Sequence, residues 1–180
     1  APLKAPDHPN PSGDRAMARA LIAALEYGGA TITLASTLRA RDGTGDATPQ
    51  TRLFDQARAE IIRLFGPGRS GGWQAWGTSY HYYKAPDLIG PSVARQLGIP
   101  YLLIEASRAR KRLTGPWARF AQAAETASDA ADVIFYFTHR DAETLERDRA
   151  GTQQLIHLPP FLMRDSVDAA ATPDGPMLAV

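Results

Sequence analysis

Three short polar stretches of this sequence combine residue types that could bind phosphate or sugar and transfer protons. The first is Ser12-Gly13-Asp14-Arg15, the second is His81-Tyr82-Tyr83-Lys84, and the third is Glu105-Ala106-Ser107-Arg108, followed by Lys111. Their cations and hydroxyls suit phosphate or a sugar, and the tyrosine rings suit the face of a sugar ring. A histidine together with a glutamate could handle protons. From the residue types alone, the three stretches together predict a phosphate-friendly cleft, with a histidine and a glutamate that could handle protons.

The first stretch stands where an amphipathic helix should begin. Ser12 is a good N-cap, and Gly13 lets a ligand come close to the free N–H groups of the first turn. Arg15 is a cation at the end of the helix where the dipole disfavours one, which predicts a nearby anion such as phosphate. The alternative is that Arg15 pairs with Asp14 or Asp7 and the loop is only a connector. Apolar residues follow at helical spacing: Met17, Leu21, Ala24 and Leu25.

The other two stretches also have structural alternatives. His81 could be a satisfied histidine under a loop, and Glu105 could pair with an arginine of its own loop. The basic run from Arg108 to Arg112 could be a solvated face. For Trp73 and Trp76, packing in the core or at a sheet edge is predicted in preference to ligand binding. No metal site is predicted, because the remaining histidines have no metal-ligand spacing: His8, His139 and His157.

Strand and helix patterns alternate along the chain. Buried strands are predicted over 30–35, 73–80, 99–105, 133–137 and 154–157, and helices begin near 13, 48, 91, 116 and 138. Residues 1–3 could be the tail of a further strand. This alternation predicts a Rossmann-like α/β fold, a doubly wound parallel sheet with helices on both faces, in the strand order 3-2-1-4-5-6. If the strand tail at 1–3 is counted as the first strand, the three polar stretches follow the first, third and fourth strands, where such sheets bind ligands.

Composition narrows the class of protein. A chain of 180 residues with 44% hydrophobic residues can bury a core in one domain, and a net charge of +1 gives no global field for nucleic acid. The absence of cysteine fits a reducing, cytoplasmic location, and no apolar run approaches the length of a membrane span. No dinucleotide fingerprint, Walker A sequence or nucleophile elbow is present, which removes the commonest dehydrogenase, NTPase and hydrolase interpretations.

Both ends of the chain look cut. Residues 1–165 are predicted to form the domain, while residues 166–180 read as a linker and the start of a missing C-terminal domain. The apolar run Met177-Leu178-Ala179-Val180 stops at the last residue, as a strand would if more chain followed.

The sequence resembles the N-terminal half of a bacterial group 1 glycosyltransferase, the retaining family-4 enzymes of GT-B fold. The resemblance covers most of the chain and depends on motif order. The family's first loop carries two adjacent glycines, for which Ser12-Gly13 stands in here, and Glu105 departs from the histidine that often ends its fourth strand. The matching segments are Pro11 to Leu21, Ala30 to Ser36, Tyr80 to Leu88, Gly90-Pro91, Ala94 to Tyr101, Glu105-Ala106-Ser107 and Leu158 to Phe161.

The resemblance implies an acceptor-binding domain that is inactive alone. The nucleotide-sugar donor would sit chiefly on the missing domain, no metal or cofactor is needed, and the acceptor would be a saccharide or a lipid-linked saccharide, the latter with peripheral membrane contact. Ser12, Gly13, Asp14 and Arg15 would face the donor diphosphate, and His81 and Glu105 would be catalytic. The acceptor-binding residues would be Tyr82, Tyr83, Lys84, Ser107, Arg108 and Lys111. Alternatives are a non-catalytic sugar- or phosphate-binding α/β module and a sugar-nucleotide epimerase domain.

Overall fold

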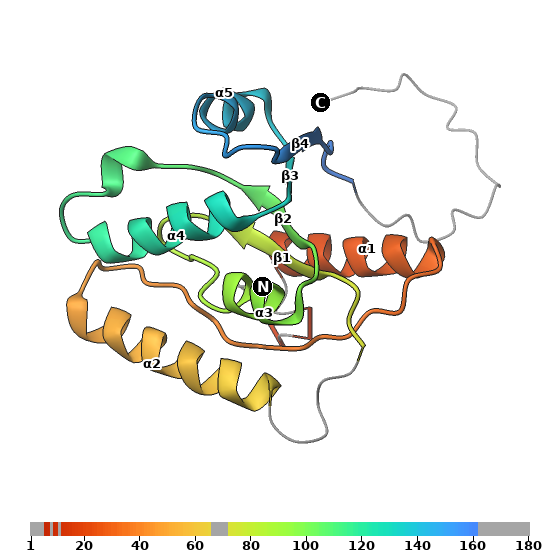
Figure 1. The fold of residues 1–180 in the computed structure, drawn as a ribbon, viewed down its shortest axis with the longest axis horizontal. Helices are drawn as coiled ribbons and strands as arrows, with labels where there is room; N and C mark the ends of the chain where they lie inside the picture. Colours follow the sequence, from red (N-terminus) through yellow and green to blue (C-terminus); the bar gives the residue numbers. More distant parts are fainter. Residues whose placement is uncertain (1–5, 8, 11, 66–71, 162–180) are drawn as a thin grey trace, which may run out of the picture.

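Four parallel strands form one sheet at the centre of the molecule (Figure 1). The computed structural model describes residues 6–7, 9–10, 12–65 and 72–161. Within them the strand order is β1-β2-β3-β4, with strands β1 Trp76–His81, β2 Tyr101–Ala106, β3 Val133–Tyr136 and β4 Gln154–His157. The helices are α1 Gly13–Tyr27, α2 Ala47–Leu64, α3 Gly90–Leu97, α4 Ala118–Ala130 and α5 His139–Arg147, with a 3-10 turn over Arg110–Arg112.

Helices cover both faces of this sheet. Leu103 of β2 packs into the core with Val93 of α3, whereas the neighbouring Ile104 lines a crevice with Met17 of α1. Successive side chains of a strand point to opposite faces, so α3 and α1 lie on opposite sides. Helix α2 packs on α4 through the edge-to-face pair Phe54 and Phe120. The predicted Rossmann-like α/β class, with a parallel sheet and helices on both faces, is confirmed.

The predicted strand order is wrong for the described part of the chain. The strand predicted third, which is β1, pairs directly with β2, and residues 30–35 form no strand. That segment instead links α1 to α2 in an extended path (Figure 1). A strand of a parallel sheet needs apolar side chains on both faces, but Thr31 and Thr33 alternate with the apolar residues and Leu34 stays 42% exposed.

Most of the predicted helix ends are confirmed. The Ser12 hydroxyl accepts a hydrogen bond from the backbone N–H of Arg15, and Thr138 accepts one from Asp141 in the same way. Gly98 ends α3 in the left-handed conformation at φ +62°. Helix α2 begins at Ala47, just before the predicted N-cap.

A buried carboxylate ties α3 to the sheet. Asp87 is only 7% exposed, and its Oδ1 accepts hydrogen bonds of 2.9 Å from the backbone N–H groups of Ile89 and Gly90. Its Oδ2 accepts from the Thr78 hydroxyl at 2.6 Å and the Tyr101 hydroxyl at 2.8 Å. One side chain therefore caps the first turn of α3 and joins it to β1 and β2, and no sequence pattern indicated this network.

Some predictions fall outside the described residues: the strand tail at 1–3 and the linker with the beginning of another domain at 166–180. In the part of the chain that the structure does describe, no helix combines the length and apolar character required to cross a bilayer.

Candidate functional site

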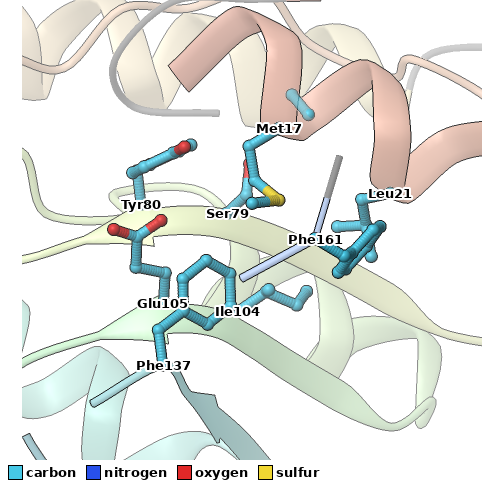
Figure 2. Close-up of a pocket in the computed structure, with 9 residues that line it drawn as sticks. Met17, Leu21, Ser79, Tyr80, Ile104, Glu105, Phe137 and Phe161 are labelled. Atoms are coloured by element: carbon cyan, nitrogen blue, oxygen red, sulfur yellow. The ribbon is translucent and has the colours of Figure 1, made fainter. Parts of the chain in front are cut away.

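Glu105 of the third predicted polar stretch lies in a crevice beneath α1, near enough to Asp14 of the first stretch to feel its charge. Met17 and Leu21 of α1 line this crevice with Tyr80 of β1 and Glu105 of β2 (Figure 2). The crevice is too narrow to hold a water molecule. A ligand that reaches Glu105 must therefore approach from the open edge of the sheet.

Tyr80 and Glu105 both adopt a left-handed backbone conformation inside regular strands. Their φ angles are +60° and +57°, and they are the non-glycine residues with positive φ in the described chain. They lie opposite each other, between the paired residues Ser79 and Ile104 on one side and His81 and Ala106 on the other. Such a conformation costs about 1–2 kcal/mol for each non-glycine residue. Strain of this kind gathers at functional sites, where the surrounding structure holds it in place.

The left-handed pair reverses the alternation of side chains at the ends of both strands. Glu105 and Tyr80 turn toward α1 (Figure 2), while His81 and Ala106 are buried with α4 on the other face. The reversal is thus what places a carboxyl group and a phenol next to each other at the C-terminal end of the two strands.

The environment of Glu105 favours its neutral form. Partial burial, with the negative charges of Asp14 and Asp141 adding to it, raises the pKa of Glu105 to about 7, although its contact with the Tyr80 hydroxyl acts the other way. Burial also raises the pKa of Tyr80, and the negative charges of Glu105 and Asp14 add to this effect. A carboxyl group that titrates near neutral pH can both accept and donate a proton at the pH of the cell.

The strain at position 105 gives a direct prediction. Glu105→Gly and Glu105→Ala both remove the carboxyl group, but only glycine adopts positive φ without a steric cost. We expect the glycine variant to be more stable than the alanine variant by about 1 kcal/mol in urea unfolding, the reverse of the usual order within a strand. Equal stabilities, or a more stable alanine variant, would mean that the backbone at this position is unstrained.

His81, predicted to be catalytic, lies in the core. It is 1% exposed, its Nδ1 accepts a hydrogen bond from the backbone N–H of Asp87, and its Nε2 lies 3.0 Å from the carbonyl oxygen of Ala124. This pattern assigns the proton to Nε2. Burial lowers the pKa of His81 below its usual value, although the nearby charge of Asp87 acts in the other direction. The lowered pKa keeps the ring neutral. The surroundings of His81 favour a role in joining β1 to α4, and its catalytic role stays a prediction.

The buried histidine should make stability depend on pH. The unfolded chain binds a proton on His81 below about pH 6.5, whereas the folded state resists it, so stability should fall as pH drops below that value. In His81→Gln we expect urea unfolding at pH 7 to show a loss of about 1–3 kcal/mol from the broken hydrogen bonds. Between pH 7 and 5 the variant should lose less stability than the wild type does. His157→Gln, at an exposed histidine, is the control. If its stability also became less dependent on pH, the effect would belong to histidines in general.

The side-chain position of Gly13, in the first turn of α1, is uncrowded. A Cβ added there would meet no atom of the described residues within 4 Å. The Arg15 guanidinium donates from Nε to the carbonyl oxygen of Pro6 at 3.2 Å, and it forms no ion pair with Asp7 or Asp14 in the described residues. The connector alternative, in which Arg15 pairs with one of these acids, therefore finds no support in the described part.

The second predicted stretch forms an aromatic cluster with residues that the sequence did not associate with it. The Tyr83 ring packs edge-to-face on Trp117 at 6.0 Å and on Tyr82 at 5.7 Å. The Lys84 ammonium lies 4.8 Å from the centre of a Trp117 ring, and the Arg112 guanidinium lies 5.3 Å from that of Tyr83. Trp117 directly precedes α4, at the helix start predicted near 116, and no sequence pattern placed its ring beside Tyr83.

The third stretch is divided between the interior and the surface. Arg108 is buried and forms ion pairs with Glu125 at 2.8 Å and Asp129 at 2.7 Å, which hold the loop to α4. Ser107 donates its backbone N–H to the carbonyl oxygen of His81, and Lys111 is exposed. The predicted acceptor residues are thus brought together only in part, since the Arg108 guanidinium is already engaged with two carboxylates.

The described histidines also come close in one place. The rings of His139 and His157 lie 4.9 Å apart, and Tyr136 stacks on His157 at 5.3 Å. No group of three or more potential metal-ligating side chains occurs among the residues with a described placement. His8 lies outside them.

Comparison of the sequence with models of protein families found no match, and comparison with curated proteins found none either. The fold is shown by the structure alone.

Proposed function

We propose that this domain forms the acceptor side of a glycosyltransferase that moves a sugar from a nucleotide-sugar to a saccharide or lipid-linked acceptor. The observation that carries the proposal is the strained Tyr80–Glu105 pair at the carboxyl edge of a parallel sheet, next to α1. A carboxyl group with a pKa of about 7, beside a helix whose first turn is uncrowded at Gly13, combines a proton acceptor with an anion-binding helix end.

In the proposed transfer reaction, Glu105, Arg15 and the start of α1 each have a separate role. The bond between the anomeric carbon and the diphosphate oxygen breaks, and a new bond forms from that carbon to the acceptor hydroxyl oxygen. The Glu105 carboxylate takes the hydroxyl proton as the bond forms. The leaving diphosphate carries away the bonding electron pair, and its charge is stabilised by the first-turn N–H groups of α1 and by Arg15.

The acceptor is held by the aromatic side chains that follow β1. The rings of Tyr82 and Tyr83 pack on each other after the end of β1, and the Lys84 ammonium lies 5.8 Å from the centre of the Tyr83 ring. Sugar rings stack their C–H faces on aromatic rings, while hydroxyls accept hydrogen bonds from cations. The domain needs no metal for this arrangement, because its own dipoles and cations meet the developing charge.

A transfer assay tests the proposal. The protein, in the full length that its gene encodes, is incubated with UDP-glucose, UDP-galactose or GDP-mannose and a mixture of neutral and acidic oligosaccharides. Release of nucleoside diphosphate and growth of the oligosaccharide by one sugar are then measured together. We expect diphosphate release with at least one donor, and we expect it to depend on an acceptor. Saccharide binding with no release from any donor would contradict the transferase and favour the non-catalytic binding module.

A further inference from the structure

The aromatic cluster beside the sheet carries positive charge that no carboxylate neutralises in the described residues. It consists of Tyr82, Tyr83, Lys84, Arg112 and Trp117, and we call it the aromatic–cation platform. Lys84 Nζ lies 4.8 Å from a Trp117 ring centre and 5.8 Å from that of Tyr83, and the Arg112 guanidinium lies 5.3 Å from the latter. Neither cation is within 4 Å of an acidic oxygen among the described residues. By contrast, the adjacent Arg110 is paired with Asp148.

Cation–π contact positions a charge without cancelling it. The attraction is weak at exposed sites, so an anionic group competes with it easily. Lys84 and Arg112 are therefore held near two aromatic rings while their charges remain available. A carboxylate or phosphate on a ligand would find both cations already in place, which reduces the cost of ordering them.

A buried scaffold fixes the platform. Asp42 is 4% exposed and holds the turn that follows it through Thr44 and Gly45, while its backbone N–H donates to the carbonyl oxygen of Lys84. Gln50, 2% exposed, donates both to Asp42 and to the carbonyl oxygen of Pro116.

Close packing completes the scaffold. A Cβ at Gly45 would lie 2.6 Å from the Pro116 side chain and 3.3 Å from the Trp117 ring, so the turn lies directly against the platform. Three loops far apart in the sequence thus present Lys84, Trp117 and the Asp42 turn as one preorganised surface.

We infer that the aromatic–cation platform binds an acidic saccharide, with a carboxylate or phosphate of the sugar between Lys84 and Arg112 and the sugar ring against Tyr83. This inference rests on the proposed function and narrows the acceptor to an anionic carbohydrate. The rings supply a surface for one or two sugar units, and the two cations supply the charge selectivity. A long polyanion such as nucleic acid is disfavoured, because the whole chain has a net charge of only +1.

Binding measurements with matched probes test the inference. Tetragalacturonate and maltotetraose have equal lengths and differ in charge, galactose 1-phosphate tests a phosphate source, and inorganic phosphate tests the anion alone. We expect tetragalacturonate to bind at least about tenfold more tightly than maltotetraose, as one charge-assisted contact provides. The double variant Lys84→Gln/Arg112→Gln should bind both tetrasaccharides equally. Arg58→Gln, which removes an exposed cation on α2, is the control and should bind as the wild type does.

The indole N–H signals of the protein locate the ligand. The chain contains three tryptophans, so its NMR spectrum should show one resolvable signal for each, and Trp117→Phe assigns the one on the platform. We expect the acidic saccharide to shift the Trp117 signal and to leave those of Trp73 and Trp76 in place.

Each other outcome overturns the inference in a distinct way. Equal binding of the acidic and neutral tetrasaccharides would show that the platform does not select by charge, without contradicting the proposed transferase function. Inorganic phosphate binding as tightly as the saccharides would show a general anion site, and tighter binding of a short single-stranded oligonucleotide would point to nucleic acid. Failure of every saccharide to bind, with no diphosphate release in the transfer assay, would contradict the proposed function as well.

Discussion

Gly90→Ala should destabilise the protein by about 2–4 kcal/mol in urea unfolding at pH 7, because the added methyl group has no space. A Cβ at this position would lie 2.2 Å from Oδ2 of Asp87, 2.6 Å from the Tyr101 ring and 2.8 Å from Nε1 of Trp76. These groups are buried and hydrogen-bonded to one another or to Thr78. The methyl group can be accommodated only by moving Asp87, which leaves buried donors without an acceptor.

Gly77→Ala is the matched control for this variant. It adds the same methyl group in β1, where the nearest atom is a side-chain carbon of Ile104 at an ordinary contact distance of 3.8 Å. Its stability should stay within about 1 kcal/mol of the wild type. A Gly90→Ala protein as stable as Gly77→Ala would show that the Asp87 network yields at low cost and does not fix α3 to the sheet.

Glu105→Gln should lower the rate of sugar transfer by about 10²–10⁴-fold, the usual contribution of a positioned general base. The amide keeps the size of the side chain but cannot take the proton of the acceptor hydroxyl. Since the raised pKa of Glu105 lies at about 7, the wild-type rate should rise with pH through that value as the carboxyl group ionises. The residual rate of the variant should not show this rise. The pH profile of kcat/KM with a fixed donor and acceptor measures both effects.

The stability of the same variant provides an independent check. In the wild type, the pKa of Glu105 is higher in the folded state than its usual value of 4.5, so the folded state binds more protons and loses stability as pH rises from about 4.5 through 7. Glu105→Gln should lack this loss and should therefore gain stability relative to the wild type toward pH 8. The exposed Glu143→Gln on α5 serves as the control for both readouts. If Glu105→Gln showed the expected gain in stability but an unchanged rate, the raised pKa of Glu105 would be supported and its role as the general base would be excluded.

Periodicity predicted the elements that bury one continuous apolar face. The strands at 76–81, 101–106, 133–136 and 154–157 and all five helices follow from spacing, caps and glycine stops, because these signals are local. The strand predicted over 30–35 was wrong. A run such as Ala30 to Ala35 becomes a strand only beside a partner strand, and the sequence does not show which edge of the sheet is free to pair with it.

The location of the candidate site at one edge of the sheet could be predicted, but the conformation and the contacts of its residues could not. Parallel topology brings the loops after β1 and β2 to one edge of the sheet, as the predicted parallel arrangement of the strands required. The left-handed turns at Tyr80 and Glu105 were not predictable, because neither residue type favours positive φ. Those turns decide that Glu105 faces α1 while His81 enters the core. The position of Trp117 beside Lys84 depends on the buried pair Asp42 and Gln50, and the hydrogen bond from Gln50 to Pro116 joins residues 66 apart along the chain.

The Asp87 network has a consequence for how the protein opens. The first turn of α3 and both of the strands that carry the site donate hydrogen bonds to one carboxylate. None of these elements can separate from the others without exposing donors that a single buried group satisfies. In amide hydrogen exchange we therefore expect β1, β2 and the start of α3 to exchange together, as one cooperative unit, through its complete opening.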